Sequence, residues 1–217
     1  MKLLRHTLIS DGSTDANLIP IINWTLKEAG NIPLAQGVRA EFWRLPQPPQ
    51  TLEDRIRKAV EFFPCEVLFI HRDAEKELPD SRQSEIRKAV LAAESEGCRV
   101  PAVTIVPVRM LEAWLLFDEY AIRQAAGNPS GRRPLNLPAL KKIENRPDPK
   151  EDLREALEAA SELTGRRLKK FNAAQAFSRI VDYLEDFSPL RQLPAYLAFE
   201  SAVRRASASG WAPGFYG

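Results

Sequence analysis

Three carboxylates of this chain follow apolar runs that have the length of buried strands. Asp11 comes two residues after the run that ends at Ile9, and Asp73 and Glu75 come soon after the run 67–70. Because ligands of parallel α/β sheets bind at the carboxyl ends of the strands, we expect the three acids to meet at one sheet edge. Such a cluster is unfavourable unless a cation or a shared proton compensates it. The spacing therefore predicts a divalent-metal site.

The second acidic segment has the more specific spacing. In an extended chain, residues two apart face the same side, so Asp73 and Glu75 can both approach one ion. Mg²⁺ favours a few carboxylates with several waters retained, which makes Mg²⁺ or Mn²⁺ the expected cofactor. The alternative is a solvated charged loop, because Lys76 and Glu77 follow directly.

Asp11 is followed by Gly12, which allows the chain to turn sharply after the strand. One interpretation makes Asp11 a metal ligand or a general base, with Asp15 at the rim of the same site. The other makes Asp11 a turn residue that caps the next helix, which aspartate does routinely. The sequence leaves both interpretations open.

His71 and Arg72 precede the second acidic segment. His71 alternates with Asp73 and therefore faces the same side, where it can line the rim of the site. A structural histidine at a strand end is the alternative. Arg72 is either a further rim residue or the partner of an acid on a helix.

Glu112 is the sole acid in the apolar helical stretch 110–117. Such a residue is rarely buried without a partner, so we expect it to face the crevice after the fourth strand, with Asp118 near the rim. An ion pair with Arg109, three residues earlier, is the alternative.

The pattern around these residues alternates between strands and helices, which is typical of a parallel α/β sheet flanked by helices. Beyond residue 108 the apolar spacing is helical. We therefore expect an α/β domain over residues 1–126 and a helical C-terminal part over 127–217, packed on it. The predicted strands are 2–9, 38–45, 66–71 and 102–107, with the last residues, 207–217, as a docked tail.

Composition limits the functional classes. The chain has 217 residues, of which 44% are hydrophobic and 28% charged, as in ordinary globular proteins. No apolar run approaches the roughly 18–20 residues of a membrane-spanning helix, and the N-terminus has no signal-peptide pattern. Two cysteines are too few for a disulfide framework, which indicates a reducing, cytoplasmic compartment.

Basic clusters, and the absence of several known catalytic motifs, further limit the reactions that the chain could catalyse. The clusters at 132–133, 166–170 and 204–205 either contact phosphate or are solvated helix ends. The sequence has no P-loop, no zinc-protease helix and no nucleophile elbow. With two histidines in all, a catalytic triad or a multi-histidine metal site is nearly excluded.

The segments 9–15, 69–75 and 111–118 together resemble the Toprim fold, which topoisomerases, primases, recombination proteins and overcoming-lysogenization-defect nucleases share. Within it, the chain is most similar to the bacterial family termed domain of unknown function 4276, over roughly residues 2–120. The resemblance places an acid/base carboxylate at Asp11 and the Mg²⁺-binding pair at Asp73 and Glu75. Asp11 is one methylene shorter, and Glu75 one methylene longer, than the residues the family pattern has there.

The resemblance implies a Mg²⁺-dependent nuclease that acts on phosphodiester bonds in nucleic acid, with a role in defence against phages or mobile elements. Two other functions remain open from the sequence. One is a non-catalytic module that binds nucleic acid or a protein partner through a degenerate site, which the two substitutions favour. The other is a phosphohydrolase of small phosphorylated ligands.

Overall fold

The computed structural model describes residues 3–12, 14–63, 65–74, 77–108 and 110–217. The chain forms two compact units: Met1–Val106 together with Pro194–Gly217 make unit 1, and Pro107–Leu193 make unit 2. The division differs from the expected boundary at residue 126. Residues after the fourth strand pack with the later helices of unit 2, whereas the last long helix returns to the sheet.

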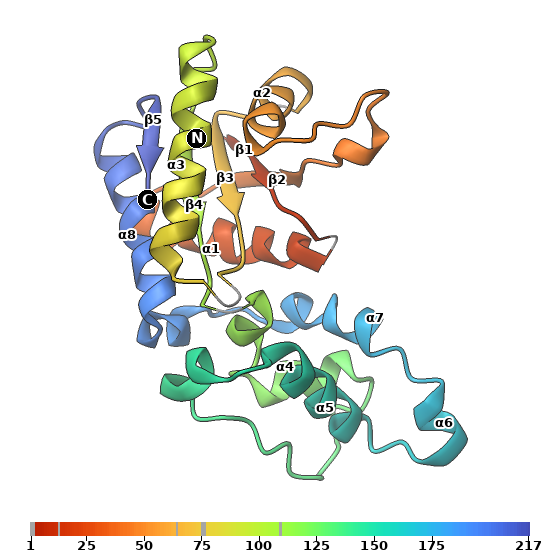
Figure 1. Ribbon diagram of the computed structural model, residues 1–217. Coiled ribbons are helices and arrows are strands. Elements are labelled where there is room, and N and C mark those ends of the chain that lie inside the picture. Colours follow the sequence, from red (N-terminus) through yellow and green to blue (C-terminus); the bar gives the residue numbers. More distant parts are fainter. Residues whose placement is uncertain (1–2, 13, 64, 75–76, 109) are drawn as a thin grey trace. The chain divides into compact units, whose positions relative to one another are not determined.

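Unit 1 contains a five-stranded sheet in which every pairing is parallel (Figure 1). The strands are β1 (Leu4–Ile9), β2 (Ala35–Arg39), β3 (Val67–His71), β4 (Pro101–Ile105) and β5 (Gly214–Tyr216). Their order across the sheet is β2-β1-β3-β4-β5. The direction of chain progression reverses between β1 and β3, so the ligand crevice of such a sheet lies at their carboxyl ends. The predicted parallel α/β fold is confirmed.

Helices cover both faces of the sheet (Figure 1). On one face α1 (Leu18–Gly30) packs against α8 (Pro194–Ala208), and on the other α2 (Leu52–Phe62) packs against α3 (Pro79–Ser95). Short 3₁₀ turns, η1 (Thr14–Asn17) and η2 (Phe42–Arg44), follow β1 and β2. Each turn starts close to the carboxyl end of its strand and therefore lies near the edge that carries the predicted acids.

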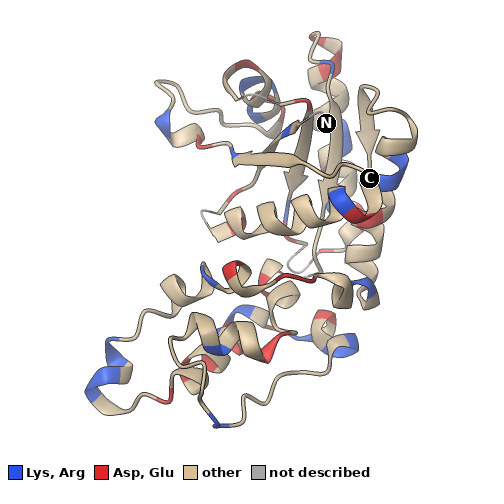
Figure 2. Cartoon of the chain, turned by 180° about the vertical axis from the view of Figure 1, so that it is seen from behind, with Lys and Arg blue, Asp and Glu red and all other residues tan. Residues whose placement is uncertain are grey.

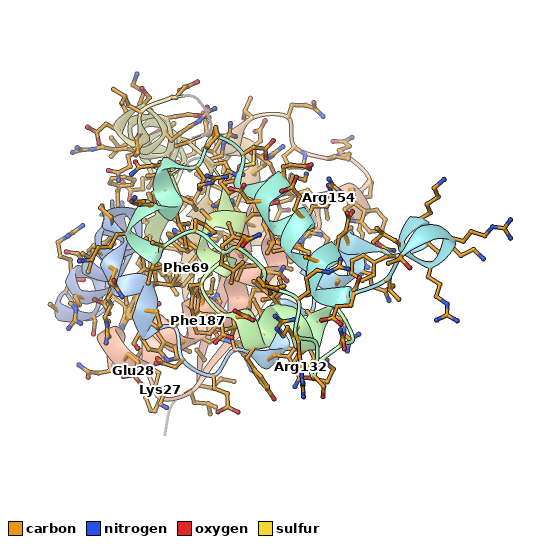
Figure 3. The ribbon with its side chains drawn as sticks, turned by 90° about the horizontal axis from the view of Figure 1, so that it is seen from below. Lys27, Glu28, Phe69, Arg132, Arg154 and Phe187 are labelled. Carbon is orange, nitrogen blue, oxygen red and sulfur yellow. The ribbon has the colours of Figure 1, made fainter. Side chains whose placement is uncertain are left out.

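The centre of the sheet is apolar on both faces, as the uninterrupted hydrophobic run of β3 predicts. All five residues of β3 are buried. Leu8 of β1 lies opposite Phe69, which is fully buried and is labelled in Figure 3. This packing fixes the register of β1 and β3, and with it the relative positions of the residues that follow them.

The second strand starts and ends earlier than the predicted range 38–45. The N–H of Ala40 donates to the carbonyl of Leu8 at 2.9 Å, and the chain then leaves the sheet. Phe42 turns inward and packs edge-to-face on Phe63, with ring centroids 5.9 Å apart. The alternating apolar positions after residue 39 therefore serve a buried turn and not a longer strand.

The segment expected to be a docked tail forms the fifth strand. β5 pairs in parallel with β4, with Phe215 opposite Ala102. Arg87 of α3 lies over the ring of Phe215, at 5.9 Å from its centroid. A strand of three residues between Gly and Pro is too short to show a periodic pattern, so the sequence could not predict it.

Unit 2 is helical, as predicted for the chain beyond residue 108. Its helices are α4 (Glu119–Ala125), α5 (Pro149–Ser161), α6 (Gly165–Lys169) and α7 (Ala173–Phe177), with 3₁₀ segments η3 (Leu111–Leu115), η4 (Leu140–Asn145), η5 (Ile180–Tyr183) and η6 (Ser188–Gln192). Trp114, Ile122 and Leu157 lie in its core. The stretch 110–117, expected as helix, forms the 3₁₀ segment η3, since five residues have little α-helical stability of their own.

Gly37 offers a test of the packing between β1 and β2. A Cβ at this position would lie 2.2 Å from Cε1 of His6 and 2.9 Å from Cγ2 of Ile19. We expect Gly37→Ala to lower the free energy of unfolding by about 1–3 kcal/mol in urea denaturation, because the buried imidazole cannot move away without repacking. Gly30→Ala is the control, since its Cβ would meet nothing closer than 3.3 Å. Equal losses in the two variants would contradict this packing.

Candidate functional site at the β1 and β3 strand ends

The turn after β1 places one aspartate inside the protein. Asp15 is buried, with 8% of its surface exposed, and its Oδ2 accepts a hydrogen bond from the N–H of Gly12 at 2.7 Å. A Cβ on Gly12 would lie 3.0 Å from the Asp15 carboxylate, so the glycine allows the close approach. The turn therefore directs Asp15, and not Asp11, into the interior.

The end of β3 is tied to β4 through His71. Its Nδ1 lies 3.1 Å from the carbonyl oxygen of Ile105, and the N–H of Arg72 donates to the same oxygen at 3.2 Å. A carbonyl oxygen can only accept, so the geometry assigns the ring proton to Nδ1. The other ring nitrogen, Nε2, is then the basic atom of the neutral side chain.

Nε2 of His71 faces two carboxylates. It lies 3.4 Å from Oδ1 of Asp73 and 3.9 Å from Oδ2 of Asp15, so these two oxygens are no farther apart than the sum of the two distances. Burial lowers the pKa of His71, and the nearby Asp15 carboxylate only partly opposes that effect. A neutral imidazole thus presents its lone pair to two carboxyl groups, an arrangement that a cation or a proton between them would stabilise.

Asp11 has a different environment. Half of its side chain is exposed, and its carboxylate forms ion pairs with Arg55 of α2 and with Nε of Arg72, the latter at 3.3 Å. Arg72 also reaches Glu85 of α3 at 3.3 Å. Two guanidinium groups therefore already compensate the charge of Asp11.

A third arginine holds the loop after β3. Nε of Arg82 donates to the backbone carbonyl of Asp73 at 3.2 Å, while its two terminal nitrogens pair with Glu85 at 3.0 Å and with Glu77 at 3.5 Å. The position of Asp73 thus depends on α3. Spacing on a helix could have indicated the pair of Arg82 with Glu85, but no sequence signal linked either residue to Asp73.

The predicted site residues of unit 1 fall into three groups. Asp15, His71 and Asp73 come together, and Asp11 and Arg72 pair beside them. Glu75 lies outside the described residues, so its predicted place in the cluster stays a prediction.

The other predicted residues belong to unit 2. Glu112 is half-buried within η3. Asp118 caps α4, because its side chain accepts the N–H of Ala121 at 2.8 Å. That Glu112 joins the crevice of the sheet stays a prediction, and its proposed partner Arg109 lies outside the described residues.

This edge brings two carboxyl groups and an imidazole together next to guanidinium groups. Asp15 and Asp73 supply carboxylate oxygens, and His71 supplies an unprotonated nitrogen. Within the described ranges, no group of three or more His, Cys, Asp or Glu side chains is arranged so that it could hold a metal ion. Carboxylate oxygens are the donors that Mg²⁺ and Mn²⁺ favour, so the expected metal site stays a prediction.

Searches with the chain find no significantly matching family model, curated protein or solved structure. Within the part of the chain that the structure describes, no helix is both long and apolar enough to cross a bilayer.

The two histidines of the chain make a prediction about pH. Burial lowers the pKa of His6 in β1 and of His71. The unfolded chain therefore binds protons more readily, and we expect the free energy of unfolding to fall as pH falls below about 6.5, by at most about 1.4 kcal/mol per pH unit for each histidine. Urea denaturation between about pH 7.5 and pH 5, above the range in which most carboxylates titrate, measures this slope. His6→Gln should reduce it, and a slope of zero or of opposite sign would contradict the assignment.

Proposed function

We propose that this chain is a Toprim-like, metal-dependent phosphodiesterase that acts on nucleic acid. The observation that carries the proposal is the convergence of Asp15 and Asp73 on the unprotonated Nε2 of His71, at 3.9 and 3.4 Å. The convergence occurs between β1 and β3, where parallel α/β sheets of this strand order bind their ligands.

A divalent cation is the group that suits this arrangement. Asp15 and Asp73 would hold Mg²⁺ or Mn²⁺, with Glu75 as the further carboxylate that the sequence predicts. A mixed oxygen and nitrogen set suits Mn²⁺ better than Mg²⁺ if His71 also binds. When bound, such an ion polarises a phosphate and stabilises the leaving oxygen. Arg82 contributes by fixing the backbone of Asp73 through its bond to the carbonyl.

The guanidinium groups beside the cluster support a phosphate-containing substrate. Arg55 and Arg72 converge on the half-exposed Asp11. Guanidinium groups bind carboxylate and phosphate oxygens with the same bidentate geometry, so a phosphate can take the place of Asp11 on them. In this scheme Asp11 orients the two arginines before the substrate binds. The alternative, which the sequence favours, is that Asp11 acts as a general base.

An exposed tryptophan at the same sheet edge supports nucleic acid over small phosphorylated ligands. Trp43, in the turn after β2, is 68% exposed, and the Arg44 guanidinium lies 5.0 Å from its ring centroid. Glu41 pairs with Arg44 at 2.7 Å and with Arg39 at 3.5 Å. Arg39 in turn donates to the carbonyl of Gly12 at 3.5 Å, which connects the turn to the β1 strand end. An aromatic face next to a cation is the usual platform for an unpaired base.

A non-catalytic nucleic-acid-binding module is the second candidate. The pairing of Asp11 with two arginines favours it, because the carboxylate that family resemblance assigns to acid/base work is already engaged.

Metal binding provides the first test of the proposal. We expect Asp73→Ala and Asp15→Ala each to weaken Mn²⁺ binding by more than about tenfold in titration calorimetry, because each removes a proposed ligand. Asp80→Ala, the loss of an exposed aspartate on α3, is the matched control and should bind as the unchanged chain does.

The same variants separate the candidate functions. Cleavage of labelled DNA or RNA with Mn²⁺ or Mg²⁺, lost in Asp73→Ala and kept in Asp80→Ala, is the expected result. Metal-independent binding without cleavage would favour the second candidate. Hydrolysis of a small phosphate diester with no effect on DNA or RNA would favour the third function considered from the sequence. Mn²⁺ affinity that is equal in all variants would remove the proposed metal site.

Stacking on Trp43 makes a separate prediction. We expect Trp43→Ala to weaken binding of single-stranded DNA by about tenfold in an anisotropy titration, because one stacked base contributes roughly 1–3 kcal/mol. Trp43→Phe should retain most of the affinity. Phe62→Ala on α2 is the control, since Phe62 is also half-exposed and lies near a cation, Lys58. A loss of affinity in Phe62→Ala as large as in Trp43→Ala would contradict stacking on Trp43.

A further inference from the structure

A dense cluster of positive charge lies on α6 of unit 2. This helix and its C-terminal cap carry Arg166, Arg167, Lys169 and Lys170 within five positions, and all four are exposed. None of the four forms an ion pair with a described residue. By contrast, Arg154 on the neighbouring helix α5 is paired with both Glu151 and Glu158.

The surrounding sequence supplies no balancing acid. No Asp or Glu occurs between Glu162 and Asp182. The Glu162 carboxylate is engaged elsewhere, because its Oε1 accepts the N–H of Arg132 and, at 2.7 Å, that of Arg133. These hydrogen bonds are the largest cause of the lowered pKa of Glu162. The positive charge of α6 is therefore not neutralised from within its own segment.

The helix also has no role in the core. It buries none of its residues, whereas α4, α5 and α7 each bury two or more. Its long side chains extend outward in Figure 3, and Figure 2 shows Lys and Arg along its length. At helical spacing, Arg166 faces Lys169 and Lys170, and like charges at such spacing destabilise a helix by a few tenths of a kcal/mol each. An anionic partner would offset that cost.

We propose that α6 is a binding surface for the phosphodiester backbone of nucleic acid, which deepens the function proposed above by locating a contact for its substrate. Closely spaced cations match a polymer that carries one charge per roughly 1.7 Å of duplex axis. An anionic membrane fits less well, because interfacial helices insert exposed apolar side chains. The apolar neighbours here, Leu168 and Phe171, are both half-buried.

The test measures binding of a labelled duplex of roughly 20 base pairs to the full chain in EDTA, by anisotropy at several salt concentrations. We expect Arg166→Gln/Arg167→Gln to lose about tenfold or more in affinity and to reduce the slope of log K against log salt by about 2. Arg166→Lys/Arg167→Lys should keep the slope. Lys141→Gln/Lys142→Gln removes two exposed charges from the same unit and is the matched control, expected to stay near the affinity of the unchanged chain. Thermal unfolding verifies that each variant is folded.

The opposite outcomes are equally specific. An equal loss of duplex affinity in the glutamine variants at 166–167 and at 141–142 would mean that only net charge matters, which would overturn the proposal. So would unchanged binding in both, or tighter binding of the unchanged chain to phosphatidylserine vesicles than to the duplex. EDTA removes divalent metal, so duplex binding through α6 is measured without the proposed metal site. The duplex titration and the Mn²⁺ titration of Asp73→Ala therefore test separate proposals. Loss of one therefore identifies which of the two proposals is wrong.

Discussion

Desolvation of a single imidazole sets the electrostatics of the candidate site. His71 is buried at the end of the central strand, and its Nδ1 is committed to the carbonyl of Ile105 on the neighbouring strand. That commitment leaves Nε2 as the only ring atom that can meet Asp15 and Asp73. Because burial disfavours the imidazolium, the neutral ring presents a lone pair to the two carboxyl groups. The parallel register of β1, β3 and β4 fixes this arrangement, since each strand delivers its last residue to the same edge.

Acids with arginine partners and acids that face the imidazole lie near this edge. Asp11 is paired with Arg55 and Arg72, and Glu85 with Arg72 and Arg82, of which Arg82 also holds the backbone of Asp73. Asp15 and Asp73 have the imidazole nitrogen as their neighbour instead.

The central part of the fold could be predicted from the sequence, because buried strands leave a strong local pattern of apolar residues. An apolar run such as 67–70 fits a buried parallel strand, and acids directly after it fall at the carboxyl edge. The burial of Asp15 could not be predicted in the same way. It depends on a turn at Gly12, whose N–H binds the Asp15 carboxylate. The roles of Arg55 and Arg82 were equally hidden, since each pairing spans from α2 or α3 to a distant strand end. Short elements such as β5 and α6 carry too few residues for a periodic pattern.

The discontinuity of unit 1 has a consequence for how the chain acquires its structure during synthesis. Strand β4 is made before all of unit 2, whereas β5 and α8, which cover its outer edge and one face, come after unit 2. While the intervening residues emerge, β4 is an unpaired edge next to an apolar surface, which is the kind of segment that pairs wrongly with other chains. Folding of unit 2 on its own would shorten the effective loop that joins β4 to α8. The inserted unit would then assist the sheet by bringing its last two elements back quickly, in addition to any role in binding.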